Sequence, residues 1–340
     1  MSLCRRHPRA GLILHQDLSR PSLQALTTSS YATAAPPKFR PYRSNVNGLV
    51  SRRDPVVLHL LTPSPVARTT STANDIIQID NTYRSRLAYR RHLLSTQPEE
   101  TYGHLSAASW SISEFYTYLF SHHLPTRFPL HFSASPSGTL VQNNTTENSF
   151  PVIAQSAANA LRAIGENVDE DFVMLLPSAE GWRVGAFVTG FPTGLRLGEK
   201  LGWQMRKAQK VEPGYDSVLT KLAPGVTNGM TRMNWSIART DELYTPNGAH
   251  CYEGEEECED ATISADECCL RVERQTMWKL PGTGAVIWGI KTYIYRLNEI
   301  KAEAGEAERL ARSIEHLGGE MGRFSAGTCW GNQVLEYLRS

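Results

Sequence analysis

Two short stretches in the second half of the chain combine charged, amide and aromatic residues where β-strands are expected. They read Arg232-Met233-Asn234-Trp235-Ser236-Ile237 and Arg271-Val272-Glu273-Arg274-Gln275-Thr276. Because successive side chains of a strand point to opposite faces, Arg271, Glu273 and Gln275 are expected to share one face, and Asn234 and Trp235 to lie on opposite faces. Ionised groups on a covered face are costly unless they are paired. Such a row predicts a solvated face, a buried ion network or a ligand site.

Aromatic residues gather in the same part of the chain. They include Trp182, Trp203, Tyr215, Trp235, Trp278, Trp288 and Tyr293. Most residues of this kind belong to a hydrophobic core. A subset placed around a carboxylate, however, suits an alkylammonium ligand, because cation–π attraction adds to the charge interaction.

Other common sites have no counterpart in the sequence. Four cysteines, at 251, 258, 268 and 269, do not match a zinc-binding spacing, and the histidines form no H-E-x-x-H motif. There is neither a G-x-G-x-x-G motif nor a P-loop, which argues against a dinucleotide or ATP site in this chain. No residue is assigned as a metal ligand from these patterns.

The elements that would position the two stretches follow from periodicity. Helices are expected over 76–94, 107–119, 154–164 and 307–317, and strands over 172–176, 182–188, 230–238, 270–280 and 283–294. The two prolines of Leu124-Pro125-Thr126-Arg127-Phe128-Pro129 are expected to prevent a helix from continuing there. Since strands follow one another directly, the fold class is α+β, with a mainly antiparallel sheet and flanking helices.

Composition limits the partners. The chain has 340 residues, 41% of them hydrophobic, and a net charge of +1, so a nucleic-acid partner is not expected. No stretch is apolar for long enough to span a membrane.

Residues 1–53 carry nine Lys and Arg against Asp17 alone, which is typical of a transit peptide and predicts a mitochondrial location. The alternative is a disordered basic tail on a cytoplasmic protein. Residues 54–75 are expected to be a linker, and residues 76–340 to form a single domain.

Several segments together resemble the heme-dependent oxidative N-demethylase-like family, called HRQ proteins in fungi. Besides the two stretches above, they are Ile79-Asp80-Asn81-Thr82-Tyr83 with Arg90-Arg91, Leu124–Pro129, Glu199-Lys200-Leu201-Gly202, Pro213-Gly214-Tyr215, Leu280-Pro281 and Ile290-Lys291-Thr292-Tyr293. The likeness spans roughly 76–340. It implies a PAS-like sheet that binds heme b, and a monooxygenase-type removal of a methyl group from a small secondary amine as formaldehyde. A separate reductase with FMN and an iron–sulfur centre would supply electrons from NADPH.

The resemblance also implies roles for individual residues. Glu273 would be the catalytic residue that pairs with the substrate ammonium, and Tyr215 and Trp235 would contact the substrate. Arg232 and Arg274 would bind the heme propionates. Gln209 stands where the family has its axial histidine, and an amide oxygen is a weaker iron ligand than imidazole. His250, or a histidine within 122–131, is the alternative ligand.

Two functions therefore remain open at this stage. The first is the oxygenase, favoured by Glu273 and by the stretch that begins at Arg232. The second is a non-catalytic PAS-like protein, a ligand-binding or accessory protein that has lost heme ligation, favoured by Gln209. The sequence assigns no oligomeric state.

Overall fold

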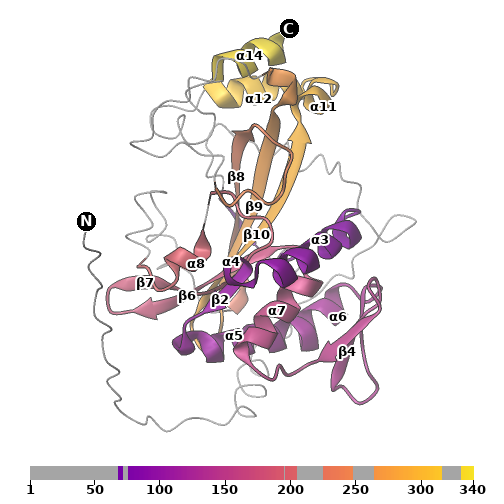
Figure 1. Ribbon diagram of the computed structural model, residues 1–340, viewed down its shortest axis with the longest axis vertical. Coiled ribbons are helices and arrows are strands. Elements are labelled where there is room, and N and C mark those ends of the chain that lie inside the picture. Colours follow the sequence, from indigo (N-terminus) through magenta and orange to yellow (C-terminus); the bar gives the residue numbers. More distant parts are fainter. Residues whose placement is uncertain (1–67, 72–75, 195, 205–224, 248–263, 316–330) are drawn as a thin grey trace, which may run out of the picture.

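The computed structural model describes residues 68–71, 76–194, 196–204, 225–247, 264–315 and 331–340 (Figure 1). The strands are β1 (Arg68–Ser71), β2 (Tyr102–His104), β3 (Phe132–Ala134), β4 (Leu140–Asn143), β5 (Asn148–Pro151), β6 (Asp171–Ser178), β7 (Gly181–Val188), β8 (Gly225–Ala238), β9 (Cys269–Lys279) and β10 (Val286–Arg296). The helices are α3 (Tyr83–Thr96), α4 (Pro98–Thr101), α5 (Ser109–Thr117), α6 (Leu124–Arg127), α7 (Ala157–Asn167), α8 (Leu197–Lys200), α11 (Leu297–Lys301), α12 (Glu306–Glu315) and α14 (Gly331–Arg339). Short 3-10 turns at Ser106–Ala108 and Ala265–Glu267 and a π-helical turn at Tyr118–His123 complete the described elements. The predicted leader, residues 1–53, lies outside them.

The main sheet has seven strands in the order β1-β8-β9-β10-β6-β7-β2, and each neighbouring pair is antiparallel. A second, three-stranded sheet has the order β3-β4-β5. This confirms the predicted α+β class with a mainly antiparallel sheet and flanking helices. The strands expected over 172–176 and 182–188 are β6 and β7, which form an antiparallel hairpin and extend further than expected, to Ser178 and from Gly181.

The start of the sheet differs from the predicted domain boundary. Arg68–Ser71 falls in the expected linker, 54–75, yet it forms β1 and pairs with β8 from Gly229 to Arg232. A four-residue edge strand carries little periodicity of its own, and its pairing depends on a partner about 160 residues away. The ordered sheet therefore begins before residue 76.

Two helix predictions were wrong in their bounds. The first helix begins at Tyr83 and not at 76, because the Asp80 carboxylate accepts a hydrogen bond from the Thr82 amide (2.8 Å) and closes a turn ahead of α3. The expected break at 124–129 is absent, since Leu124–Arg127 forms α6. Pro125 lies in the first turn, where a helix does not need the amide hydrogen that proline lacks.

Helices cover one face of the main sheet, which we call the back face. Near β6 and β7, α3, α5 and α7 pack on it through residues such as Phe115, Phe172 and Trp278. At the other end of β8–β10, α11, α12 and α14 pack around Trp235 and Leu310. Figure 1 shows these two helical groups at opposite ends of the long strands. In the described part of the chain, no helix is long and apolar enough to cross a membrane.

The opposite face, here the front face, has a different cover. Its apolar cluster joins Val173, Met277, Trp288 and Ile290 of the sheet to Leu197 of the short helix α8. Next to this cluster, the residues of β8 and β9 that point forward are polar. The front face is therefore where the sheet presents functional side chains.

Candidate active site

Glu273 occupies the centre of a polar row on the front face. The register of β8, β9 and β10 places Glu273 beside Asn234 and Thr292. Its Oε2 accepts hydrogen bonds from Gln275 Nε2 (2.9 Å) and Asn234 Nδ2 (3.4 Å). Arg232 Nε donates to Gln275 Oε1 (2.6 Å), which extends the row across both strands. Arg232, Asn234, Gln275, Glu273 and Arg271 are called the front row below.

The second carboxylate oxygen of Glu273 is not used in the same way. The Glu273 side chain keeps 16% of its surface exposed, and its Oε1 lies 3.9 Å from Arg271 Nε. No described residue donates a hydrogen bond to this oxygen. A carboxylate oxygen that receives no hydrogen bond from the described neighbours can accept one from a ligand.

Arg271 connects Glu273 to the loops at the rim of the sheet. Its Nη2 donates to the carbonyl oxygen of Phe191 (2.7 Å), with longer contacts to the Glu242 and Leu243 carbonyls (3.4 Å). The side chain is 2% exposed, and its Nε makes no hydrogen bond. Burial lowers the pKa of Arg271, although Glu273 and Asp171 oppose this effect. Arg271 thus fixes two loops while it keeps a cation beside Glu273.

Asp171, the first residue of β6, shapes one of those loops. Its carboxylate accepts hydrogen bonds from Thr189 Oγ1 (2.7 Å), the Gly190 amide (2.7 Å) and the Phe191 amide (3.0 Å), and it pairs with Arg90 of α3. A Cβ at Gly190 would lie 2.8 Å from Arg90 Cγ, so only glycine fits there without a shift. The Phe191 carbonyl that Arg271 binds is thereby held in place.

The predicted site residues do not all meet. Arg232 pairs with Gln275, whereas Arg274 pairs with Met233 and Lys291, so Arg232 and Arg274 lie on opposite faces of the sheet. The same alternation separates Trp235 from Glu273. Trp235 is 2% exposed and packs in the core under α12 and α14. This arrangement does not allow Trp235 to contact a substrate next to Glu273. It also does not allow both arginines to bind one heme.

The remaining predicted residues are placed as follows. Tyr215, Gln209 and His250 lie outside the described residues. His122, His123 and His131 pack around Tyr118, Phe128 and Tyr83 in the core of the back face, away from Glu273. Burial lowers the pKa of His123 to about 3, so its imidazole is neutral. Of the described residues, no group of three or more His, Cys, Asp or Glu could hold a metal ion.

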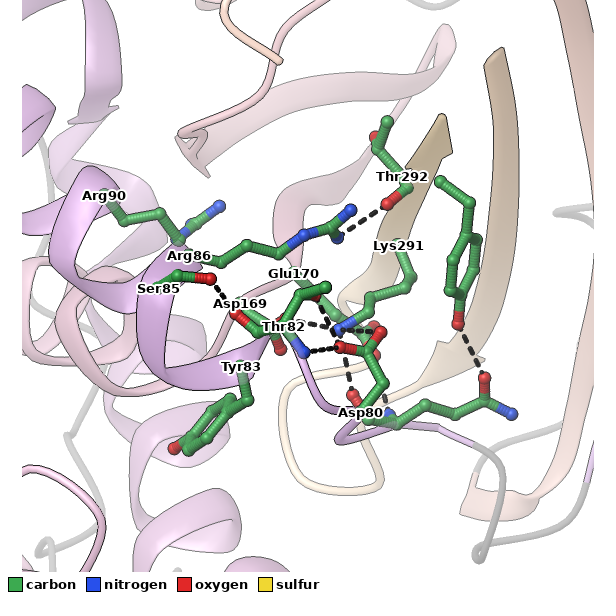
Figure 2. Close-up of polar contacts among 12 residues, drawn as sticks. Asp80, Thr82, Tyr83, Ser85, Arg86, Arg90, Asp169, Glu170, Lys291 and Thr292 are labelled. Atoms are coloured by element: carbon green, nitrogen blue, oxygen red, sulfur yellow. Dashed lines mark hydrogen bonds and ion pairs between the residues drawn. The ribbon is translucent and has the colours of Figure 1, made fainter. Parts of the chain in front are cut away.

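Sequence reasoning missed a second charged group, which is buried on the back face of the sheet (Figure 2). Lys291 of β10 is fully buried and forms an ion pair with Asp169, and its Nζ lies 3.4 Å from Asp80 Oδ2 and 3.2 Å from the Gln78 carbonyl oxygen. Arg86 of α3 donates to the Thr292 carbonyl oxygen (2.6 Å). These contacts attach α3 and the segment before β6 to β10.

The carboxylates of this buried group, called the back cluster below, titrate differently. Burial alone would raise the pKa of Asp80, but Lys291, Arg86 and the hydrogen bonds from Thr82 together lower it. Burial raises the pKa of Glu170 from 4.5 to about 7, against the opposing effects of Arg274 and Lys291. Glu170 Oε1 accepts a hydrogen bond from the Gln78 amide (2.8 Å), and Oε2 accepts none. Two sequence signals mark this cluster, a lysine inside an apolar strand and the run Asp169-Glu170-Asp171 ahead of β6.

The chemistry of the front face fits part of a heme group. Arg232 is half-buried next to the buried apolar side chains of Met277, Trp288 and Ile290, and a guanidinium in such a place suits the carboxylate of an otherwise apolar group. Arg232 is therefore the one of the two predicted arginines that shares a face with Glu273. The described residues of this face include no histidine, and they do not account for an iron ligand.

A comparison with protein families shows where the chain belongs. The family model described as "Haem-dependent oxidative N-demethylase, alpha subunit-like" matches residues 67–335. The match covers most of the chain and begins next to β1, inside the expected linker. The chain therefore belongs to this family of heme-dependent oxidative N-demethylase-like proteins, as the resemblance predicted.

Proposed function

We propose that the protein is a heme-dependent oxygenase that removes a methyl group from a small secondary amine as formaldehyde. Membership in the family supports the reaction class. The observation that carries the proposal is the Glu273 carboxylate, whose Oε2 is held by Gln275 and Asn234 and whose Oε1 receives no hydrogen bond from the described residues. An ammonium N–H can donate to this oxygen, and such charge-assisted hydrogen bonds are the strong ones.

The residues around Glu273 would orient and bind the amine. Gln275 and Asn234 fix the carboxylate, so little side-chain entropy remains to be lost when the amine binds. Arg271 lies on the Oε1 side, with its Nε 3.9 Å from that oxygen, and its charge attracts the carboxylate. In this proposal Glu273 is the catalytic residue that contacts the substrate, and Asn234 and Arg271 are positioning residues.

The cofactor would lie against Met277, Trp288 and Ile290, with Arg232 at a carboxylate. When bound there, heme supplies the iron at which oxygen is activated. Overall, the amine and O2 with two electrons and two protons give the demethylated amine, formaldehyde and water. The proposed source of the electrons is a separate reductase that carries FMN and an iron–sulfur centre and oxidises NADPH.

The proposed location is the mitochondrion, on the basis of the basic residues in 1–53.

A second candidate function is a ligand-binding protein that does not hold heme. Gln209 favours it, because a histidine at that position would be a better iron ligand. The two candidates differ in whether the purified chain takes up heme and oxidises an amine.

The experiment uses the full chain, haemin and dimethylamine, with hydrogen peroxide in place of O2 and the reductase. Peroxide and dimethylamine balance to methylamine, formaldehyde and water, so no partner protein is needed. We expect a Soret band after haemin addition, and formaldehyde that falls about tenfold or more in Glu273→Gln at low amine concentration. The control is Glu166→Gln, which changes an α7 carboxylate that pairs with Arg162 at the surface. A chain that takes up haemin without forming formaldehyde, or that takes up none, contradicts the oxygenase.

A further inference from the structure

Gln275 links two functional groups of the front row through a single amide. Its Oε1 accepts from Arg232 Nε (2.6 Å), and its Nε2 donates to Glu273 Oε2 (2.9 Å). A guanidinium can only donate and an ionised carboxylate can only accept, so these two neighbours fix which way the amide points. Gln275 is 1% exposed, and its contacts are therefore poorly screened by water.

Two cations act on the one carboxylate of the row. Arg271 Nε lies 3.9 Å from Glu273 Oε1, and Arg232 acts on Oε2 by polarising the Gln275 amide. Both effects stabilise the negative charge of Glu273 before any ligand arrives, and they therefore compete with an ammonium ion for it. An anionic group at Arg232 would weaken one of these two effects.

We propose that Gln275 is a positioning residue that couples an anion bound at Arg232 to a cation bound at Glu273. The proposal rests on the function given above, in which a heme carboxylate meets Arg232 and an amine meets Glu273. Neutralising the guanidinium reduces its pull on the Gln275 amide, and Glu273 then binds the ammonium more tightly. The coupling is reciprocal, so the amine also strengthens binding of the anion. Loading of the cofactor would in this way prepare the amine site without any change of fold.

The size of the effect follows from typical coupling between sites, which changes affinity by about 5- to 150-fold. We expect a value near the lower end, because one neutral amide lies between the two charges. The proposal requires the Arg232 guanidinium, the Gln275 amide and a carboxylate on the incoming group. Removal of any one of them should abolish the dependence.

The experiment titrates dimethylammonium chloride into the full chain by calorimetry, with and without haemin. For the native chain, we expect haemin to tighten amine binding by about fivefold or more. Haemin dimethyl ester, which lacks the carboxylates, should give less than about a twofold change, and so should haemin with Gln275→Leu. Gln275→Met preserves the side-chain length in case the leucine variant does not fold. Its thioether cannot donate to Glu273, so the same loss of dependence is expected.

Gln78→Leu is the matched control. Gln78 also hydrogen-bonds a neighbouring side chain, the Tyr293 hydroxyl (2.9 Å), but on the back face, so the haemin dependence should persist in this variant. The proposal is overturned if haemin leaves the amine affinity of the native chain unchanged, whether it binds or not, or if both Gln275 variants keep the full dependence. Glu273→Gln separates this failure from that of the proposed function. If only the coupling is wrong, Glu273→Gln still weakens amine binding in the presence of haemin.

Discussion

The two faces of the central sheet use similar side chains in different ways. On the back face, Lys291 is fully buried between Asp169 and Asp80, with Glu170 and Arg274 close by. On the front face, Glu273 keeps part of its surface exposed and holds only one of its two oxygens in hydrogen bonds to its neighbours. One strand, β9, contributes to both groups, since Glu273 points forward and Arg274 points back.

The difference separates a structural ion network from a ligand site. The back cluster joins three segments that are far apart in sequence, around residues 80, 170 and 291. Its side chains are buried, so their charges are compensated by one another instead of by solvent. The front row is built on two adjacent strands and leaves one carboxylate oxygen of Glu273 without a hydrogen bond from the described residues. We therefore expect changes to the back cluster to alter stability, and changes to the front row to alter amine binding.

The largest effect is expected from Lys291→Met. The substitution leaves Asp169 and Asp80 buried without their cation, and breaking a buried ion pair in this way costs about 3–5 kcal/mol of unfolding free energy. Urea unfolding monitored by tryptophan fluorescence measures this loss. Lys279→Met is the control, because Lys279 of β9 is half-buried against the Trp182 ring, and we expect a loss below about 1 kcal/mol. Equal losses in the two variants would mean that the back cluster does not stabilise the fold.

Trp235→Ala tests whether Trp235 belongs to the back-face core or to the substrate site, to which the resemblance assigned it. The indole lies in the back-face core, so its removal should cost about 3–5 kcal/mol of stability. Amine affinity, measured by calorimetry on the folded protein, should not change. Trp235→Phe provides a milder change if the alanine variant does not fold. A loss of amine affinity at full stability would return Trp235 to the substrate site.

A smaller effect concerns pH. The folded pKa of Glu170, about 7, lies above its ordinary value of 4.5, so between these pH values the folded state binds more protons than the unfolded state. Stability should therefore fall as the pH rises from about 4.5 to 7, by roughly 1–3 kcal/mol. Glu170→Gln should remove this slope, and Glu166→Gln should retain it. Asp80 acts in a separate range, because its lowered pKa makes stability fall only as the pH drops below about 3.8. The free energy of unfolding is measured by chemical unfolding at several pH values. If it changes with pH in Glu170→Gln as it does in the native chain, Glu170 is not the group responsible.

The sequence predicted what depends on neighbours along the chain. The alternation along 271–276 gave the correct face for Arg271, Glu273 and Gln275, and the apolar runs gave the β6–β7 hairpin. It could not say which residues of β8 share a face with Glu273, because a shift of one residue in strand register exchanges the two faces. For this reason Trp235 was grouped with Glu273, whereas Asn234 and Arg232 are the β8 residues on its face. Arg274 is a different case, because the alternation along β9 itself places it on the face opposite Glu273.

The back cluster was missed for a related reason. Its members come from the turn before α3, the residues before β6, and β10, and only the tertiary structure brings them together. A lysine in an apolar strand shows that a buried partner is needed, but it does not show which acid provides it. The proline-containing segment was misjudged because the π-helical turn Tyr118–His123 runs directly into α6, and Pro125 falls in the first turn of α6, where its missing amide hydrogen is not needed.

The most direct test of the account is the amine affinity of Glu273→Gln. The substitution preserves shape and removes the charge, and the loss of one charge-assisted contact, worth roughly 1.5–3 kcal/mol, corresponds to a ten- to hundredfold weaker affinity. Calorimetric titration with dimethylammonium chloride should show this loss with little change in unfolding free energy, and Glu170→Gln should bind the amine as the native chain does. Unchanged amine affinity in Glu273→Gln, together with a clear loss of stability, would show instead that Glu273 is a structural partner of Arg271.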